Sequence, residues 1–167
     1  MQKLSTLEII KGKILTKDEL TLALSRWRFF DRRIVFTNGC FDILHLGHID
    51  YLSKAADEGD VLIIGLNTDS SVSRLKGKGR PINDQEQRSM VLASLHMVTA
   101  VVLFDEPTPL ELIRLVQPDI LVKGGDYRPE EIVGYDIVRA KKGEVKILSF
   151  LEGYSTTAIE QKIRAQH

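Results

Sequence analysis

Short apolar runs alternate with segments of helical periodicity from Arg33 onward, and this alternation restricts the fold more than any other feature. Each run has the length of one buried strand. Neighbouring parallel strands need a crossover, which a helix usually provides, so the pattern is typical of a parallel sheet. We therefore predict an α/β fold: a Rossmann-like, doubly wound, mostly parallel sheet with helices on both faces. The predicted strands are residues 34–36, 61–66, 99–104, 120–122 and 145–149.

The predicted helices begin at polar residues that favour helix N-termini. Thr16 and Glu19 have the spacing of a capping box, and so do Thr157 and Glu160. A basic loop that contains glycine is expected at residues 74–81. The predicted helices are residues 16–30, 47–58, 84–97, 108–116 and 130–140, and a closing helix from residue 157.

The composition is that of a globular protein with one main domain, predicted at residues 33–167 after an N-terminal arm and amphipathic helix at 1–32. The single cysteine, Cys40, excludes an internal disulfide and is typical of a reducing compartment. Basic and acidic residues are equal at 23 each, which disfavours extended contact with nucleic acid. No apolar run is long enough to span a bilayer, and the first residues lack the apolar core of a signal peptide. We expect a cytoplasmic protein that binds neither nucleic acid nor a membrane.

The predicted topology gathers several unusual loops at one place. Right-handed crossovers bring the carboxyl ends of parallel strands to one edge of the sheet, where ligands bind. The loops after residues 36, 66 and 122 and the segment before the last helix should all lie at this edge. We therefore expect one active site there.

The segment Thr37–His48, Thr-Asn-Gly-Cys-Phe-Asp-Ile-Leu-His-Leu-Gly-His, indicates the chemistry of that site. His45 and His48 lie three residues apart at the start of a predicted helix, so they share one face. Gly47 lets a ligand approach the backbone, and the helix N-terminus favours an anion. The segment predicts a phosphate site with two imidazoles, which fits chemistry on a nucleoside triphosphate.

Other readings of the two histidines are weaker. A zinc site would need at least one further ligand, and neither a cysteine pair nor the H-E-x-x-H pattern is present. Two core or capping histidines are the structural alternative. The dinucleotide fingerprint G-x-G-x-x-G and the P-loop pattern are absent, which disfavours the usual NAD and P-loop classes.

Charged residues near this edge admit two interpretations each. The cluster Arg74, Lys76, Lys78 and Arg80 is either a solvated loop or a mobile loop that closes over a triphosphate. Asp42 is either a turn or capping residue, or a ligand for Mg²⁺ or a substrate hydroxyl.

Two later segments also have residues suited to binding a ligand. The glycines of Lys123-Gly-Gly-Asp-Tyr127 would let the backbone approach a flat base, with Asp126 bonded to the ribose or base; a plain turn is the alternative. Gly153-Tyr-Ser-Thr-Thr157 places hydroxyls and free amides at a helix start. Thr157 is expected to cap the helix, while Ser155 and Thr156 contact phosphate.

His45-Leu-Gly-His48 resembles the H-x-G-H signature of the cytidylyltransferase-like nucleotidyltransferases, and Ser155-Thr-Thr157 is similar to their second signature. With Asn67-Thr-Asp69, Arg88 and residues 123–127, the resemblance covers about residues 33–164. Within this family, the stretches 37–48, 118–127 and 153–157 are most similar to the adenylyltransferases of ADP-heptose synthesis. In many bacteria that enzyme is fused to a sugar kinase; here no kinase is present, so a stand-alone form is expected.

The resemblance implies transfer of AMP from ATP to D-glycero-β-D-manno-heptose 1-phosphate, with Mg²⁺, giving ADP-heptose and pyrophosphate for lipopolysaccharide or other surface glycans. The implied catalytic residues are His45, His48, Lys78 and Arg88. The implied nucleotide-binding residues are Asn38, Gly39, Cys40, Phe41, Gly47, Asn67, Asp69, Gly124, Asp126, Ser155, Thr156 and Thr157. The implied substrate-binding residues are Asp42, Lys76 and Arg80; the metal ligands stay unassigned.

The resemblance also implies partners and leaves alternatives open. A homodimer and a functional association with a separate heptose kinase are expected, besides ATP and a sugar phosphate. A cytidylyltransferase acting on glycerol 3-phosphate or another phosphorylated alcohol would share both signatures. A nucleotide-sensing module without turnover is the rival from another class. The presence of both histidines, Arg88 and the basic cluster favours an enzyme.

Overall fold

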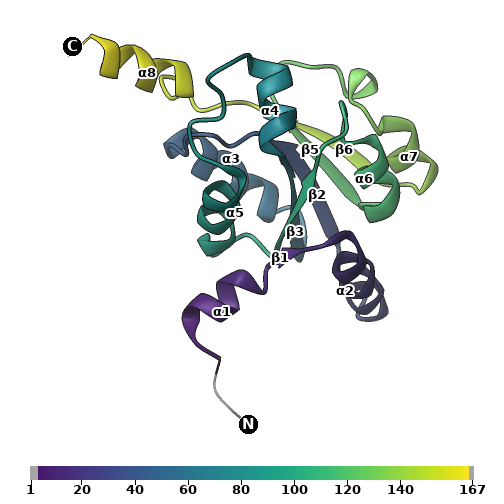
Figure 1. Ribbon diagram of the computed structural model, residues 1–167. Coiled ribbons are helices and arrows are strands. Elements are labelled where there is room, and N and C mark those ends of the chain that lie inside the picture. The colour runs from purple at the N-terminus through teal and green to yellow at the C-terminus, as the bar shows by residue number, and fades with distance from the viewer. Residues whose placement is uncertain (1–3, 166–167) are drawn as a thin grey trace.

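The computed structural model describes residues 4–165, whose centre is one six-stranded parallel sheet (Figure 1). The strand order is β1-β4-β3-β2-β5-β6, and every neighbouring pair is parallel. The predicted Rossmann-like class is confirmed. The strands are β1 (Ile14–Leu15), β2 (Ile34–Gly39), β3 (Val61–Asn67), β4 (Ala100–Phe104), β5 (Ile120–Gly124) and β6 (Glu144–Leu148).

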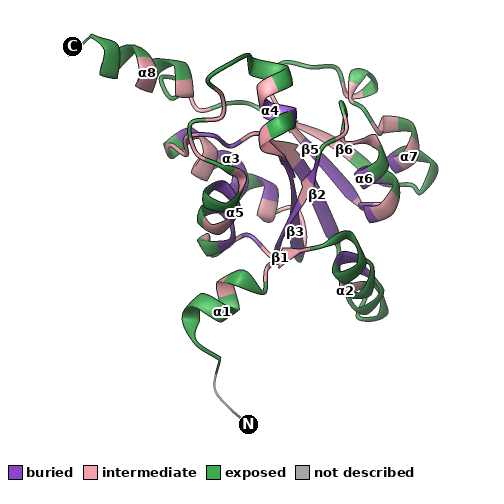
Figure 2. Cartoon of the chain, in the orientation of Figure 1, coloured by how far each residue is buried: buried purple, intermediate pink, exposed green. Residues whose placement is uncertain are grey.

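Helices cover both faces of the sheet, because alternate residues of each strand point to opposite sides. Ile34 and Phe36 of β2 belong to one buried cluster and Val35 to the other. Figure 2 shows this buried layer between the helices. The helices are α1 (Thr6–Lys11), α2 (Lys17–Phe29), α3 (Leu46–Ala56), α4 (Asp69–Lys76), α5 (Gln85–Ser94), α6 (Leu110–Val116), α7 (Tyr135–Ala140) and α8 (Thr156–Arg164), with a 3₁₀ turn at Pro129–Glu131.

The strand order reverses beside β2. The chain runs from β2 through β3 to β4 on one side, then returns to β5 and β6 on the other. In open α/β sheets the crevice beyond the carboxyl ends of the strands at such a point is where ligands bind. Here that crevice is bordered by the loop after β2 and the turn after β5.

The N-terminal segment takes part in the same sheet and core. β1 pairs with β4, with Ile14 opposite Val101. α2 buries Leu20 and Leu24 in the cluster that also holds α6 and α7. The expected arm therefore contains a sheet strand and a core helix that follow a short helix, α1, and neither β1 nor α1 was predicted. Among the described helices, none is long and apolar enough to cross a membrane.

Two predicted boundaries at the ligand edge are wrong. The expected loop 74–81 begins only at Gly77, because Thr68 caps α4 by accepting a hydrogen bond from the amide of Ser71 at 3.2 Å. The last helix is capped by Ser155, whose Oγ accepts from the amide of Ala158 at 3.0 Å, and not by Thr157. From this edge α8 extends outward, and no residue of its described part is buried (Figures 1 and 2).

Candidate active site

The imidazole rings of His45 and His48 are stacked at the start of α3. His45 is the N-cap residue and His48 lies in the first turn, with ring centroids 3.9 Å apart and planes inclined by 28°. The Nδ1 atoms of both rings are buried and have no hydrogen-bond partner within the described chain. The predicted shared face is confirmed. Two imidazole nitrogens are thus left without a partner in the described part of the protein.

Gly47 makes room for this stack. A Cβ atom at Gly47 would lie 3.1 Å from two atoms of the His45 ring and 3.3 Å from the Cβ of Tyr154. These contacts are tighter than ordinary packing. The glycine of the signature therefore lets the His45 ring lie against the first turn of its own helix.

Both histidines are neutral at pH 7. Burial, followed by the nearby His45 ring and Lys76, lowers the pKa of His48 to about 4, and burial lowers the pKa of His45. Each ring therefore offers one N–H donor and one acceptor instead of a fixed cation. A bound phosphate would favour the protonated form and raise both pKa values.

Two adjoining cavities open at this edge, and His48, Phe150 and Thr156 line both. The histidine cavity, of about 380 Å³, contains His45 and Ser155 in addition. The lysine cavity, of about 300 Å³, contains two lysines in addition and reaches the end of β2. Its further lining residues are Asn38, Gly39, Cys40, Phe41, Asp42, Tyr51, Lys76, Lys123, Gly124 and Tyr127.

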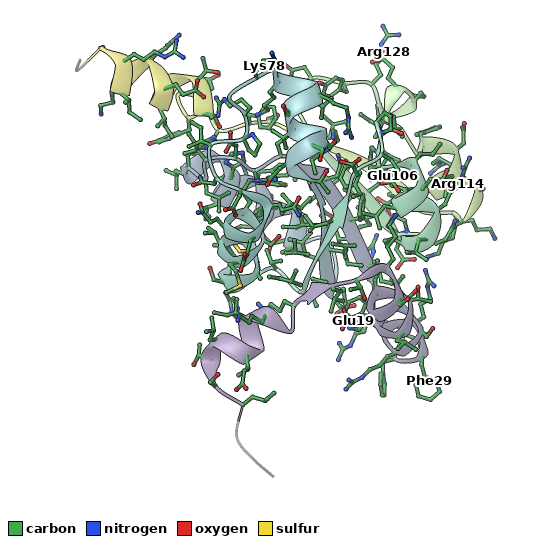
Figure 3. The ribbon with its side chains drawn as sticks, in the orientation of Figure 1. Glu19, Phe29, Lys78, Glu106, Arg114 and Arg128 are labelled. Carbon is green, nitrogen blue, oxygen red and sulfur yellow. The ribbon has the colours of Figure 1, made fainter. Side chains whose placement is uncertain are left out.

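Of the two lysines expected near the phosphates, Lys76 lies at the cavity. Lys76 ends α4 and lines the lysine cavity. Lys78 is exposed on the loop beyond α4 and lines neither cavity; Figure 3 shows it at the outer end of the molecule. No helix was predicted at residues 69–76; Lys76 is the last residue of α4, and Lys78 lies on the loop beyond it.

Asp42, which lines the lysine cavity, and Arg80 hold the basic loop in place. The side chain of Asp42 is buried, and its Oδ1 accepts hydrogen bonds from the amides of Ile82 and Asn83 at 2.8 and 3.0 Å. Its Oδ2 pairs with Arg80, which also pairs with Glu160 of α8. These contacts occupy the carboxylate and the guanidinium. The expected role of Asp42 as a metal or sugar ligand stays a prediction.

Arg88 is also committed to the protein. Its residue is 2% exposed, and its guanidinium donates to the backbone oxygens of Cys40, Asn67 and Asn83 at 2.7, 2.8 and 3.0 Å. It also pairs with Asp69 at 2.7 Å. Arg88 thus fastens the loop after β2 to the end of β3. It lines neither of these two cavities but borders a third one of about 620 Å³, which Phe41 and Asp42 also line. The expected contact of Arg88 with pyrophosphate stays a prediction.

The glycine turn after β5 is covered by aromatic rings. A Cβ atom at Gly124 would lie 2.4 Å from the ring of Phe150, and one at Gly125 would lie 2.9 Å from the ring of Tyr127. Both aromatic residues are more than half exposed, at 61% and 55%. The turn therefore lies beneath the flat, exposed rings of Phe150 and Tyr127. Asp126 is exposed at its outer side.

The remaining expected nucleotide contacts divide into two groups. Those that line a cavity are Asn38, Gly39, Cys40, Phe41, Gly47, Gly124, Ser155 and Thr156. Those that line neither are Asn67, Asp69, Asp126 and Thr157. Asn67 instead donates to the Ser71 hydroxyl at 2.9 Å and so supports α4.

Several cavity residues were missed by sequence reasoning, among them Phe150 and Tyr154 as well as Lys123 and Tyr51. Lys123 donates from Nζ to Oδ1 of Asn38 at 3.2 Å, and burial lowers its pKa. Tyr51 shares a 2.6 Å hydrogen bond with Thr37, and burial raises its pKa to about 12. The position of Lys123 directly after a buried apolar strand was the available signal, because lysine is rarely buried without a reason.

The Cytidylyltransferase-like family model matches residues 36–162, and the chain belongs to this family of nucleotidyltransferases. The bifunctional protein HldE of Wolinella succinogenes is 57% identical over 152 residues, which are 91% of this chain and 31% of that protein. HldE of Nitratiruptor sp. is 60% identical over 134 residues, which are 80% of this chain and 28% of that protein. The chain thus spans about a third of the length of these relatives.

Solved structures agree with the family. A lipopolysaccharide core biosynthesis protein from Thermoplasma volcanium is 31% identical, with a TM-score of 0.58 over 74% of this chain and 99% of that one. A pantoate-beta-alanine ligase from Francisella tularensis superposes with a TM-score of 0.61 over 90% of this chain and 76% of that one. At 16% identity, the second likeness shows the shared fold alone.

Proposed function

We propose that this chain transfers AMP from ATP to D-glycero-β-D-manno-heptose 1-phosphate, giving ADP-heptose and pyrophosphate. The observation that carries the proposal is the stacked pair His45 and His48, of which His48, like Thr156, lines both cavities while His45 lines the histidine cavity. A polyphosphate that spans both cavities would place its reacting phosphorus at His48. An attacking group and a leaving group would then occupy separate cavities.

The chemistry is an in-line displacement. An oxygen of the sugar phosphate attacks the α-phosphorus of ATP, and the bond between that phosphorus and the bridging oxygen to the β-phosphate breaks. The sugar phosphate is already ionised, so catalysis consists of alignment and charge stabilisation. In this proposal His48 donates to the α-phosphate, while His45, Ser155 and Thr156 hold the departing pyrophosphate.

ATP would enter with Mg²⁺. No group of three His, Cys, Asp or Glu side chains suited to a metal occurs in residues 4–165, and Arg80 occupies Asp42. This fits a magnesium ion held mainly by the phosphates and water, as this ion commonly is with nucleotides. The ion would supply additional positive charge at the triphosphate.

The base and the sugar are assigned from resemblance together with the cavity. We propose that adenine lies at the Gly124–Asp126 turn, against the flat rings of Tyr127 and Phe150. The heptose assignment rests on the stretches 37–48, 118–127 and 153–157 and on the similarity to HldE proteins and to a lipopolysaccharide core biosynthesis protein.

The setting of the enzyme is part of the same proposal. We infer a homodimer in the cytoplasm, where ATP is supplied, that acts after a heptose kinase. The similarity of the chain to about one third of a bifunctional protein supports a second activity that works together with this one.

A pyrophosphate-release screen tests the proposal. Four nucleoside triphosphates are paired with D-glycero-β-D-manno-heptose 1-phosphate and with glycerol 3-phosphate, with Mg²⁺. We expect turnover with ATP and the heptose phosphate. Preferential turnover of CTP with glycerol 3-phosphate would instead identify a cytidylyltransferase. Tight nucleotide binding without pyrophosphate release from any pair would indicate a sensing module.

A further inference from the structure

Lys123 is a partly buried cation that forms no ion pair within the described structure. It follows the buried residue Val122 in β5, and its Nζ reaches the lysine cavity, where it donates to the amide oxygen of Asn38 at 3.2 Å. No ion pair joins it to a carboxylate of residues 4–165. A desolvated charge that has only a neutral partner is costly, so the position calls for an anion.

Exposed lysines differ among themselves in this respect, and some of them, such as Lys76 and Lys78, form no ion pair with the described residues. Four lysines that lie closer to the solvent than Lys123 each form an ion pair with a carboxylate. They are Lys17 with Glu106, Lys54 with Asp50, Lys141 with Asp119, and Lys146 with Glu58. Lys123 therefore takes no part in ion pairs of this kind. Its charge is reserved for something that enters the cavity.

We propose that Lys123 binds the phosphate group of the acceptor substrate and positions the attacking oxygen. The proposal rests on the function proposed above. An in-line displacement needs the attacking and leaving oxygens on opposite sides of the α-phosphorus. With that phosphorus at His48, the histidine cavity takes the leaving pyrophosphate. The lysine cavity takes the acceptor phosphate at Lys123 and also the adenine at Gly124, Tyr127 and Phe150.

The surroundings of Lys123 suit this task. Asn38 accepts one of the three ammonium protons and fixes the direction of the side chain, which leaves the others for phosphate oxygens. Burial lowers the pKa of Lys123, and a phosphate dianion next to it would restore the charged form. The lysine itself neither gains nor loses a covalent bond in the reaction.

The test is a comparison of Lys123→Met with Lys123→Arg and with Lys54→Met, a matched control on the surface of α3. Loss of one charge-assisted hydrogen bond corresponds to a change of about 10- to 100-fold. For Lys123→Met we expect the KM for the heptose phosphate to rise by about this factor, with the KM for ATP within about 3-fold of wild type. Lys123→Arg should recover part of the loss, and Lys54→Met should match wild type.

Each outcome is informative. A rise in the KM for ATP with an unchanged acceptor KM would overturn the proposal, because Lys123 would then serve the nucleotide. An unchanged KM for both substrates would overturn it as well. Thermal unfolding of each variant identifies a folding defect. If the wild-type protein releases no pyrophosphate, the proposed function is refuted, but the anion-binding role of Lys123 can still be tested. Calorimetry then measures the binding of inorganic phosphate, which wild type must show and Lys123→Met must lose; any other result overturns the role of Lys123.

Discussion

His48 makes the stability of this protein depend on pH in a definite direction. Its pKa falls from 6.5 to about 4 on folding, because burial and the nearby His45 and Lys76 disfavour the charged ring. In the unfolded chain the ordinary value returns. Between these two values the unfolded chain binds more protons than the folded protein does. The free energy of unfolding contributed by this residue is therefore complete above pH 6.5 and is lost as the pH falls toward 4.

The magnitude follows from the two pKa values. For a single group with these values, lowering the pH from 7 to 5 removes about 2 kcal/mol of stability. The ring is only partly shielded, and solvent screening reduces this figure. We expect a loss of about 1–2 kcal/mol that belongs to His48 alone.

Urea unfolding at pH 7 and pH 5 measures this loss. Trp27, which packs against the core, supplies a fluorescence signal. We expect wild type to lose about 1–2 kcal/mol more than His48→Gln, which keeps a polar side chain but does not titrate. The control His96→Gln removes a histidine that lines neither cavity and should follow wild type. Equal losses in wild type and His48→Gln would refute the reasoning.

Three further changes test other parts of the site. His48→Ala should lower turnover by roughly 100-fold or more while leaving the fold intact, as loss of a transition-state donor does; near-normal pyrophosphate release would contradict the role of His48. Arg88→Met strands buried carbonyl oxygens and should cost about 3 kcal/mol in urea unfolding, whereas Arg114→Met, at a surface pair (Figure 3), should cost less than about 1 kcal/mol. Glu160→Gln breaks the pairing of α8 with Arg80 and should raise the KM for ATP and speed amide exchange in α8; unchanged exchange would show that the pair does not hold the helix.

Features that depend on neighbouring residues could be predicted from the sequence. Val61–Asn67 is buried at every position, so an unbroken apolar run sufficed to identify β3. The spacing of His45 and His48 fixes their shared face once α3 exists. The predicted helix starts at Thr16 and Asp84 are also confirmed, because both side chains cap their helices.

Features set by distant contacts could not be predicted. β1 has two residues, and its pairing with β4 joins positions far apart in the chain. α4 is short and mostly polar, and it is held by the Thr68 cap and by the burial of Val72. The three carbonyl oxygens around Arg88 come from separate loops, so no local pattern reveals that this arginine is enclosed.

These enclosed charges explain how a chain with a formal net charge of zero presents a positive cavity. Two acidic residues near the site form ion pairs with arginines, the buried Asp42 with Arg80 and the partly exposed Asp69 with Arg88. Lys76 and Lys123 line the lysine cavity, and neither forms an ion pair with the part of the chain that the structure describes. The acidic and arginine side chains of the signature loops therefore hold the loops in place, while the lysines and the neutral histidines are left to meet a polyanion. Electrostatic focusing in a cavity depends on this local balance and not on the sum over the chain.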